Sequence, residues 1–170
     1  NNQLKSLRKE IEVAAMQLGE EWNGKKSQAN LSHIWISPYG KGYEEHMDEI
    51  KNFDTVMDII LGILNRNRDK VSLTYFGTET GVCFLSDAVD VVLQNVTKFE
   101  HRERDWYVEA KMKNKSVWTE YIDVYTRDVT LSVSAPVYSE DHFIGVISLD
   151  LPIKVIKKDI LDMSFAGCNY

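Results

Sequence analysis

A cluster of aromatic and charged residues between positions 99 and 150 carries most of the chemistry in this chain. An arginine precedes a tryptophan–tyrosine pair, and the segments that follow contain a further tyrosine and two aspartates. The candidate binding residues are Phe99, Arg104, Trp106, Tyr107, Tyr121, Asp123 and Asp150. These residue types can hold a small molecule that has both an anionic and a cationic group, and nothing in them indicates bond-making.

Two residues of this cluster would hold the opposite ends of such a ligand. The planar guanidinium of Arg104 can bind a carboxylate through two parallel hydrogen bonds. The aromatic rings would surround an ammonium group by cation–π contact, while Asp150, together with Asp123, accepts its hydrogen bonds. The volume that remains in the pocket would then select the ligand's side chain.

Each candidate also has a simpler structural interpretation. Arg104 could pair with Glu100 or Glu103 on a helix surface. Asp150 could cap a helix that begins near Pro152, because aspartate is a preferred N-cap residue. The aromatic residues could belong to the core or to the packing of a sheet. Only the joint pattern favours a small-molecule site over these alternatives.

Length and composition limit the class of protein. The chain has 170 residues, of which 44% are hydrophobic, so it is long enough to bury one core, and we expect one domain. It has 20 basic and 26 acidic residues and a net charge of −6, which argues against a nucleic-acid partner. No stretch approaches the ~18 uninterrupted apolar residues of a membrane span. Since the chain begins with an asparagine and has neither an initiator methionine nor a secretory signal, we expect it to be a piece of a longer polypeptide.

Motifs for catalysis and metal binding are missing from the sequence. The acidic segment 44–49 contains a histidine but lacks the His-Glu-x-x-His spacing, so we expect it to lie on the surface. There is no Gly-x-Ser-x-Gly motif and no phosphate-binding loop. Cys83 and Cys168 fit neither a disulfide framework nor a zinc site, and two free thiols are expected more than a bridge. We therefore expect no catalytic residue, metal or cofactor.

The first helix is predicted over residues 4–22, where apolar residues recur with helical spacing. Asn23 and Gly24 end it. Leu4, Ile11 and Leu18 are also spaced as in a heptad, so this helix could form a homodimer by pairing with a copy of itself. Packing against its own domain is the favoured alternative.

The rest of the chain alternates between helical and extended patterns. An irregular connection is predicted at 27–42. Further helices are predicted at 53–64, 104–113 and 153–163, and strands at 71–75, 82–85, 118–125, 129–138 and 143–151. This order predicts an α+β fold of PAS-like type, with a five-stranded antiparallel sheet and helices gathered on one side.

The region from about 72 to 150 resembles the ligand-binding module of Cache sensor domains. These are extracytoplasmic sensing domains of chemoreceptors, histidine kinases and related membrane signalling proteins. The resemblance depends on the segments 104–110, 121–123, 132–138 and 145–150, together with Trp118. It implies a single domain over 1–170, with a long helix at 1–24, the sheet and pocket at 71–151, and a C-terminal helix and link at 152–170. It also implies a membrane-distal module that is followed by a second, membrane-proximal one.

The same resemblance assigns a role to each residue of the cluster. Amino-acid-binding members of the family use an aromatic residue, an Arg-x-Trp-aromatic motif, a tyrosine and an aspartate at the end of the last strand. Six of the seven candidates match this order, and the seventh, Asp123, lies in the same predicted strand as Tyr121. Two departures are visible: Phe99 stands where tyrosine is common, which removes a hydroxyl group, and Asp105 stands where proline is common, which changes the local loop.

The resemblance implies a receptor domain that senses a small amino acid, amine or carboxylate outside the cell membrane. The signal would pass to a cytoplasmic kinase, phosphatase, cyclase or chemotaxis assembly. The alternative is a module without a ligand that serves dimerisation through the first helix. An enzyme is a remote third possibility.

Overall fold

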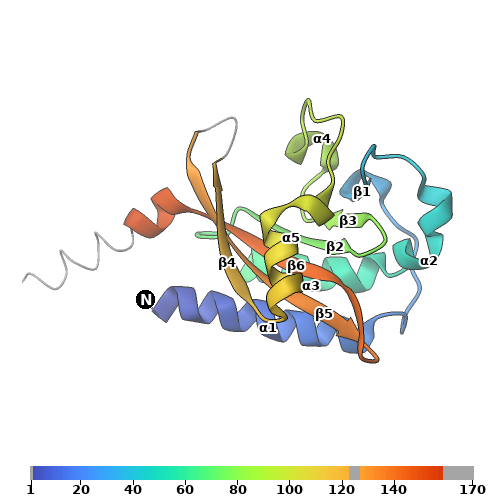
Figure 1. The fold of residues 1–170 in the computed structure, drawn as a ribbon, viewed down its shortest axis with the longest axis horizontal. Helices are drawn as coiled ribbons and strands as arrows, with labels where there is room; N and C mark the ends of the chain where they lie inside the picture. The colour runs from blue at the N-terminus through green and yellow to red at the C-terminus, as the bar shows by residue number, and fades with distance from the viewer. Residues whose placement is uncertain (1, 123–126, 159–170) are drawn as a thin grey trace, which may run out of the picture.

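The computed structural model describes residues 2–122 and 127–158. Its centre is a six-stranded antiparallel sheet with the order β1-β3-β2-β6-β5-β4 (Figure 1). The strands are β1 (Ile34–Ile36), β2 (Leu73–Thr78), β3 (Val82–Leu85), β4 (Val117–Ile122), β5 (Val129–Ser139) and β6 (His142–Pro152). The helices are α1 (Asn2–Glu21), α2 (Met47–Ile50), α3 (Phe53–Arg66), α4 (Val89–Val92) and α5 (Asp105–Lys113), with 3-10 turns η1 (Leu31–His33), η2 (Tyr43–His46) and η3 (His101–Glu103).

The predicted α+β fold is confirmed, but the sheet has one strand more than the sequence indicated. The additional strand, β1, lies in the stretch 27–42 that was predicted to be irregular, and it pairs with β3 at the edge of the sheet. It is only three residues long and is surrounded by turn-forming residues, so its hydrophobic pattern is too short to recognise. All three of its residues are buried.

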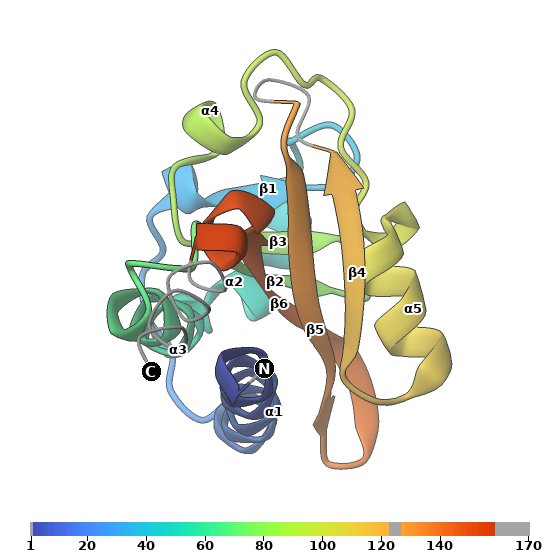
Figure 2. The same ribbon diagram turned by 90° about the vertical axis from the view of Figure 1, so that its left-hand side faces the viewer.

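Helices cover both faces of the sheet, so the prediction that they gather on one side was wrong. α1 and α3 cover one face, and α5 covers the other (Figure 2). The reason is that the strands carry apolar side chains in both directions. Tyr75, Leu85, Val117 and Val146 point away from α1, and they need a cover that α5 provides.

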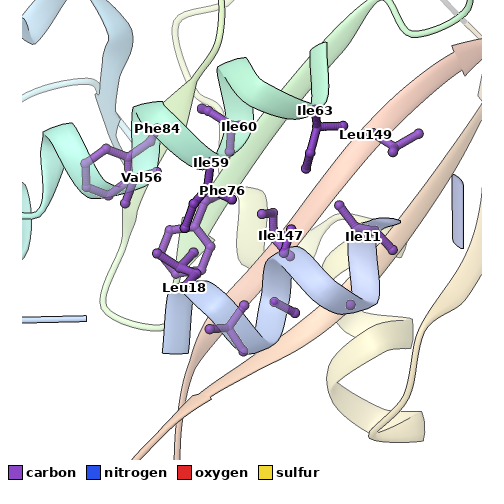
Figure 3. Packing of buried hydrophobic residues seen from close by; sticks show 14 of the residues in the cluster. Ile11, Leu18, Val56, Ile59, Ile60, Ile63, Phe76, Phe84, Ile147 and Leu149 are labelled. Carbon is purple, nitrogen blue, oxygen red and sulfur yellow. The ribbon is translucent and has the colours of Figure 1, made fainter. Parts of the chain in front are cut away.

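The main core lies between the sheet and helices α1 and α3 (Figure 3). Ile11 and Leu18 of α1 are both 0% exposed and pack with Phe76 and Ile147 of the sheet. The heptad face of this helix is therefore used inside its own domain. The favoured prediction, that this helix packs against its own domain, is confirmed, and Ile11 and Leu18 have no exposed surface with which to pair with a second copy of the chain.

The long hairpin of β5 and β6 provides the frame for the candidate site. Its turn contains Glu140 and Asp141 with φ of 49° and 66°, which is the geometry of the two-residue turn that suits twisted strands. In the resulting register Ser132 of β5 lies opposite Asp150 of β6. The site face of this hairpin therefore carries hydroxyl groups close to a carboxylate.

Two further observations concern the ends of the chain and its thiols. Residues 153–158 begin a helix directly after β6, as predicted, while the remainder of that predicted helix and Cys168 lie outside the described residues. Cys83 is a buried free thiol in β3. In the part of the chain that the structure describes, no helix is long and apolar enough to span a membrane.

Candidate ligand-binding site

Asp150 is the centre of the candidate site. Its side chain is 3% exposed, and three hydroxyl groups donate to it. The hydroxyls of Tyr75 and Ser132 lie 2.6 and 2.7 Å from Oδ1, and that of Tyr121 lies 2.8 Å from Oδ2. Hydrogen bonds to a carboxylate are stronger than neutral ones, and they offset the cost of burying it. Asp150 lies within β6, which continues to Pro152, so it does not occupy the N-cap position of the helix that begins at residue 153.

Tyr75 connects this carboxylate to the aromatic part of the site. Its ring meets the ring of Trp106 edge to face, with centroids 4.8 Å apart. Burial, followed by the nearby charge of Asp150, raises the pKa of Tyr75 well above its ordinary value, so the hydroxyl keeps its proton and stays a donor. Trp106 is 7% exposed and contacts the ring of Tyr75, whose hydroxyl binds the carboxylate.

Arg104 lies at the start of α5, two residues before Trp106, and its side chain is exposed. The structural alternative predicted an ion pair with Glu100 or Glu103. Glu100 is instead bound by Arg102, through two hydrogen bonds of 2.8 and 2.7 Å. Within residues 2–122 and 127–158, Arg104 has no carboxylate within ion-pair distance. Its guanidinium is available to an anion that arrives from solvent.

Tyr107 has a different position from the one predicted. It is 1% exposed, and its hydroxyl donates to Glu79 rather than facing Asp150. Lys111 also binds this carboxylate. Burial acts to raise the pKa of Glu79, but the hydrogen bonds from Lys111 and Tyr107 outweigh it, and the pKa is lowered overall. Tyr107 thus ties α5 to the β2–β3 turn.

Phe99 is half-buried beside Trp35. The two rings meet edge to face at 6.4 Å, and the indole N–H of Trp35 donates to the carbonyl of Phe99 across 2.8 Å. This contact holds the segment before Arg104 against the edge strand β1. The remaining predicted residue, Asp123, lies outside the described residues.

Two residues of the site were not predicted from the sequence. Tyr75 and Ser132 both donate to Asp150, and a buried chain of hydroxyls continues from Tyr75 to Ser148 and Ser134. A signal was present, because serines at every second position of β5 point to one face of a strand. Their partner on β6 could not be identified without the register.

Apolar side chains continue from this cluster toward solvent. Leu73 pairs with Asp150 in the register of β2 and β6 and lies on the same face. Partly buried residues pack around the aromatic core near it: Leu73, Val89, Val92, Leu93 and Phe99. An open groove of about 270 Å³ lies elsewhere, between α1 and β5, and does not include Asp150. Within the described residues, no group of three or more His, Cys, Asp or Glu side chains could hold a metal ion.

Residues 25–158 match the family described as the methyl-accepting chemotaxis protein-like, first PDC sensor domain. The chain belongs to this family. The predicted Cache-type sensor, PAS-like in fold, is thereby confirmed, and so is its role as a ligand-sensing domain of the chemoreceptor type. That a second, membrane-proximal module follows stays a prediction, which the description as a first sensor domain supports.

Relatives of this PDC sensor domain are chemoreceptors. The chain is 27% identical over 163 residues to the methyl-accepting chemotaxis protein McpC of Bacillus subtilis, covering 92% of this chain and 22% of that protein. The ligand-binding domain of chemoreceptor CtaA of Pseudomonas fluorescens, solved with L-valine, is similar at 20% identity and a TM-score of 0.62, covering 91% of this chain and 55% of that one.

A further solved domain has the same fold. The ligand-binding domain of chemoreceptor Tlp3 of Campylobacter jejuni, in complex with 4-methylisoleucine, is 16% identical with a TM-score of 0.60, covering 89% of this chain and 52% of that one. The chain spans about a fifth of the curated relative and about half of these solved domains. At this level of identity the structural likeness shows the fold.

Proposed function

We propose that this PDC sensor domain binds a small amino acid outside the cell membrane, as part of a membrane-anchored chemoreceptor. The observation that carries the proposal is the contrast between its two charged groups. Asp150 is a buried carboxylate surrounded by hydroxyl donors, and Arg104 is an exposed guanidinium with no described partner. An α-amino acid supplies a cation for the first group and an anion for the second.

The ammonium group of the ligand would take the place of one or more hydroxyl donors at Asp150. Tyr121 is the donor on the exposed side, because it is half-buried whereas Tyr75 and Ser132 are buried. Trp106 would contribute cation–π attraction from its ring face. The carboxylate would bind Arg104 at the N-terminal end of α5, where the helix dipole also favours negative charge.

The ligand's side chain would meet an apolar surface. The partly buried residues that pack against the core on this face are aliphatic or aromatic, and one of them, Leu73, is the neighbour of Asp150 on β2. A charged side chain placed there would lose its hydration without gaining a partner. We therefore expect valine, leucine or isoleucine to bind more tightly than aspartate or lysine.

Signalling would follow from the way in which the first helix packs on the strands that hold Asp150. Gly19 of α1 lies directly on the backbone of β5, since a Cβ atom there would be 2.0 Å from the carbonyl oxygen of Tyr138. A shift of the β5–β6 hairpin on binding would therefore move α1. A ligand can drive such a change only by binding one arrangement more tightly than the other.

One observation favours the second candidate, a structural module without a ligand. The carboxylate of Asp150 already receives three hydrogen bonds from the protein, so it does not need a ligand to be stable. In that case the hydroxyl network would serve only to hold β2, β4, β5 and β6 together.

Calorimetric titration separates the two candidates. The purified domain is titrated with L-valine, with N-acetyl-L-valine, which lacks the ammonium, and with isobutylamine, which lacks the carboxylate. The proposal expects saturable binding of L-valine and much weaker binding of both analogues. The full panel of L-amino acids is screened by thermal shift in parallel. No binding and no rise in melting temperature with any of them would favour the structural module.

A further inference from the structure

His101 occupies an unusual place beside the candidate site. It is 0% exposed and lies in the 3-10 turn η3, three residues before Arg104. Both ring nitrogens have partners: Nε2 lies 2.7 Å from the carbonyl oxygen of Thr78, and Nδ1 lies 3.0 Å from the hydroxyl of Ser37. A carbonyl only accepts, so Nε2 carries a proton, whereas the Ser37 hydroxyl can either donate to Nδ1 or accept from it. The imidazole thus connects the ends of β1 and β2.

The same ring supports Trp106. The imidazole and the indole are nearly parallel, with an interplanar angle of 21° and centroids 6.4 Å apart, and Tyr107 meets the imidazole edge to face at 5.4 Å. On its other side the imidazole lies on the backbone of Gly77, where a Cβ atom would be 2.5 Å from the ring carbon Cδ2. A glycine in β2 is therefore required for His101 to lie flat between the sheet and the aromatic rings.

We propose that His101 is a positioning residue for ligand binding, which fixes the indole of Trp106 against Tyr75, a donor to Asp150, and fixes the backbone that precedes Arg104. This inference rests on the proposed function. Trp106 is held between the imidazole of His101 and the ring of Tyr75, whose hydroxyl binds Asp150. One neutral side chain thus connects the end of β1, the end of β2 and the start of α5.

Burial also keeps this residue neutral. Desolvation lowers the pKa of His101 to about 4, although the bond to Thr78 and the charge of Glu100 oppose that change. In this neutral form Nε2 donates to the carbonyl of Thr78, and Nδ1 accepts from the hydroxyl of Ser37. The aromatic stack beside Asp150 therefore rests on an uncharged ring.

Two substitutions separate the contributions of this ring. His101→Gln keeps a donor that can reach Thr78 but removes the stacking surface. His101→Phe keeps the surface but leaves the carbonyl of Thr78 without its donor.

The matched control is Ile63→Ala, which loosens the core on the opposite face of the sheet. All three are measured for cooperative melting and for affinity toward the L-amino-acid panel. The Trp106 indole N–H is followed by NMR and assigned with Trp106→Phe.

A positioning role predicts that both His101 variants bind the best amino acid of the panel at least about tenfold more weakly and shift the Trp106 indole signal. Ile63→Ala should melt earlier yet keep its affinity within about twofold of the wild type. Should His101→Phe fail to fold, Ser37→Ala is the milder variant, and a loss of about threefold is expected for it.

Other results would overturn the inference. Folded His101 variants that bind like the wild type would show that the ring only fills space. An equal loss of affinity in Ile63→Ala would show that general loosening, and not positioning, reduces binding. Absence of binding by the wild-type domain would contradict the proposed function itself, and with it the role of His101, so the two failures are distinguishable.

Discussion

The hydroxyl of Tyr121 donates to Oδ2 of Asp150 across 2.8 Å, although the two residues are 29 positions apart in the chain. Tyr121 belongs to β4 at one edge of the sheet, and β5 lies between it and the strand that carries Asp150. The contact therefore depends on the antiparallel register of three strands. It brings together a half-buried donor and a buried carboxylate at the point where an ammonium group would bind.

Asp150→Asn should abolish amino-acid binding and lower stability. The amide is neutral and presents one acceptor oxygen where the carboxylate presents two, so all three hydroxyl donors lose a charged partner and at least one of them faces an NH2 group that cannot accept. We expect a loss of about 1–3 kcal/mol in the free energy of unfolding. Denaturant titration and calorimetry measure the two effects. Asp90→Asn, on exposed α4, is the control and should change neither.

Arg104→Ala should affect binding and leave the fold intact. The side chain is exposed and has no described ion-pair partner, so stability should change by less than about 0.5 kcal/mol. Affinity for L-valine should fall strongly, while the weak binding of isobutylamine, which has no carboxylate, should not change. Arg68→Ala provides a matched exposed arginine. Equal affinity of Arg104→Ala and wild type for L-valine would refute the role of Arg104 as the anion site.

Tyr107→Phe should lower stability and leave amino-acid binding intact, which is the reverse of what we expect for Arg104→Ala. It removes the hydrogen bond to Glu79 while the ring stays in the core, so we expect a loss of about 1 kcal/mol in stability. Affinity for the amino acid should stay within about twofold, because the hydroxyl does not face Asp150. Thermal or denaturant unfolding measures the change in stability, and calorimetry on the same sample measures the affinity. A loss of affinity at unchanged stability would show instead that the hydroxyl of Tyr107 contributes to ligand binding.

Stability should decrease as the pH falls from about 6.5 toward 4. His101 has an ordinary pKa of 6.5 when unfolded and a pKa of about 4 when folded. Between these values the unfolded state binds a proton that the folded state does not, so folding becomes less favourable, by up to about 3 kcal/mol. Denaturant midpoints measured across this range give the profile.

The controls for this profile isolate His101. In His101→Gln the free energy of unfolding should no longer change with pH above about pH 5. The control, His142→Gln at the exposed start of β6, should keep the profile of the wild type. Glu100 acts at lower pH, since the hydrogen bond from Arg102 lowers its pKa below the ordinary 4.5. A profile of the wild type that is flat between pH 5 and 6.5 would contradict the buried, neutral histidine.

Much of the fold could be predicted from local patterns. The helical spacing of apolar residues in α1 and α3, and the alternation in β2, β5 and β6, identified these elements with boundaries close to the observed ones. The short strand β1 was missed, because three residues do not establish a period. The side on which α5 packs could not be predicted either, because both faces of the strands are apolar and only the tertiary arrangement divides them.

Several residues of the candidate site could be predicted from the sequence, but the contacts between them could not. The sequence pattern selected Tyr121 and Asp150, which are in direct contact, and Trp106, which reaches Asp150 through Tyr75. It also grouped Tyr107 with the ligand wall, although adjacent helix positions point about 100° apart, and the next residue after Trp106 faces Glu79. Tyr75 could not be assigned, because its partner lies 75 positions away.

The most direct test of the account is a crystal structure of the domain grown with the L-amino acid that binds it most tightly. We expect the ammonium nitrogen within about 3 Å of Asp150, the carboxylate on the guanidinium of Arg104 and the indole of Trp106 against the ligand. A domain that binds its amino acid elsewhere, for example in the groove between α1 and β5, with Asp150 still bound by Tyr75, Tyr121 and Ser132 and not by the ligand, would contradict the account.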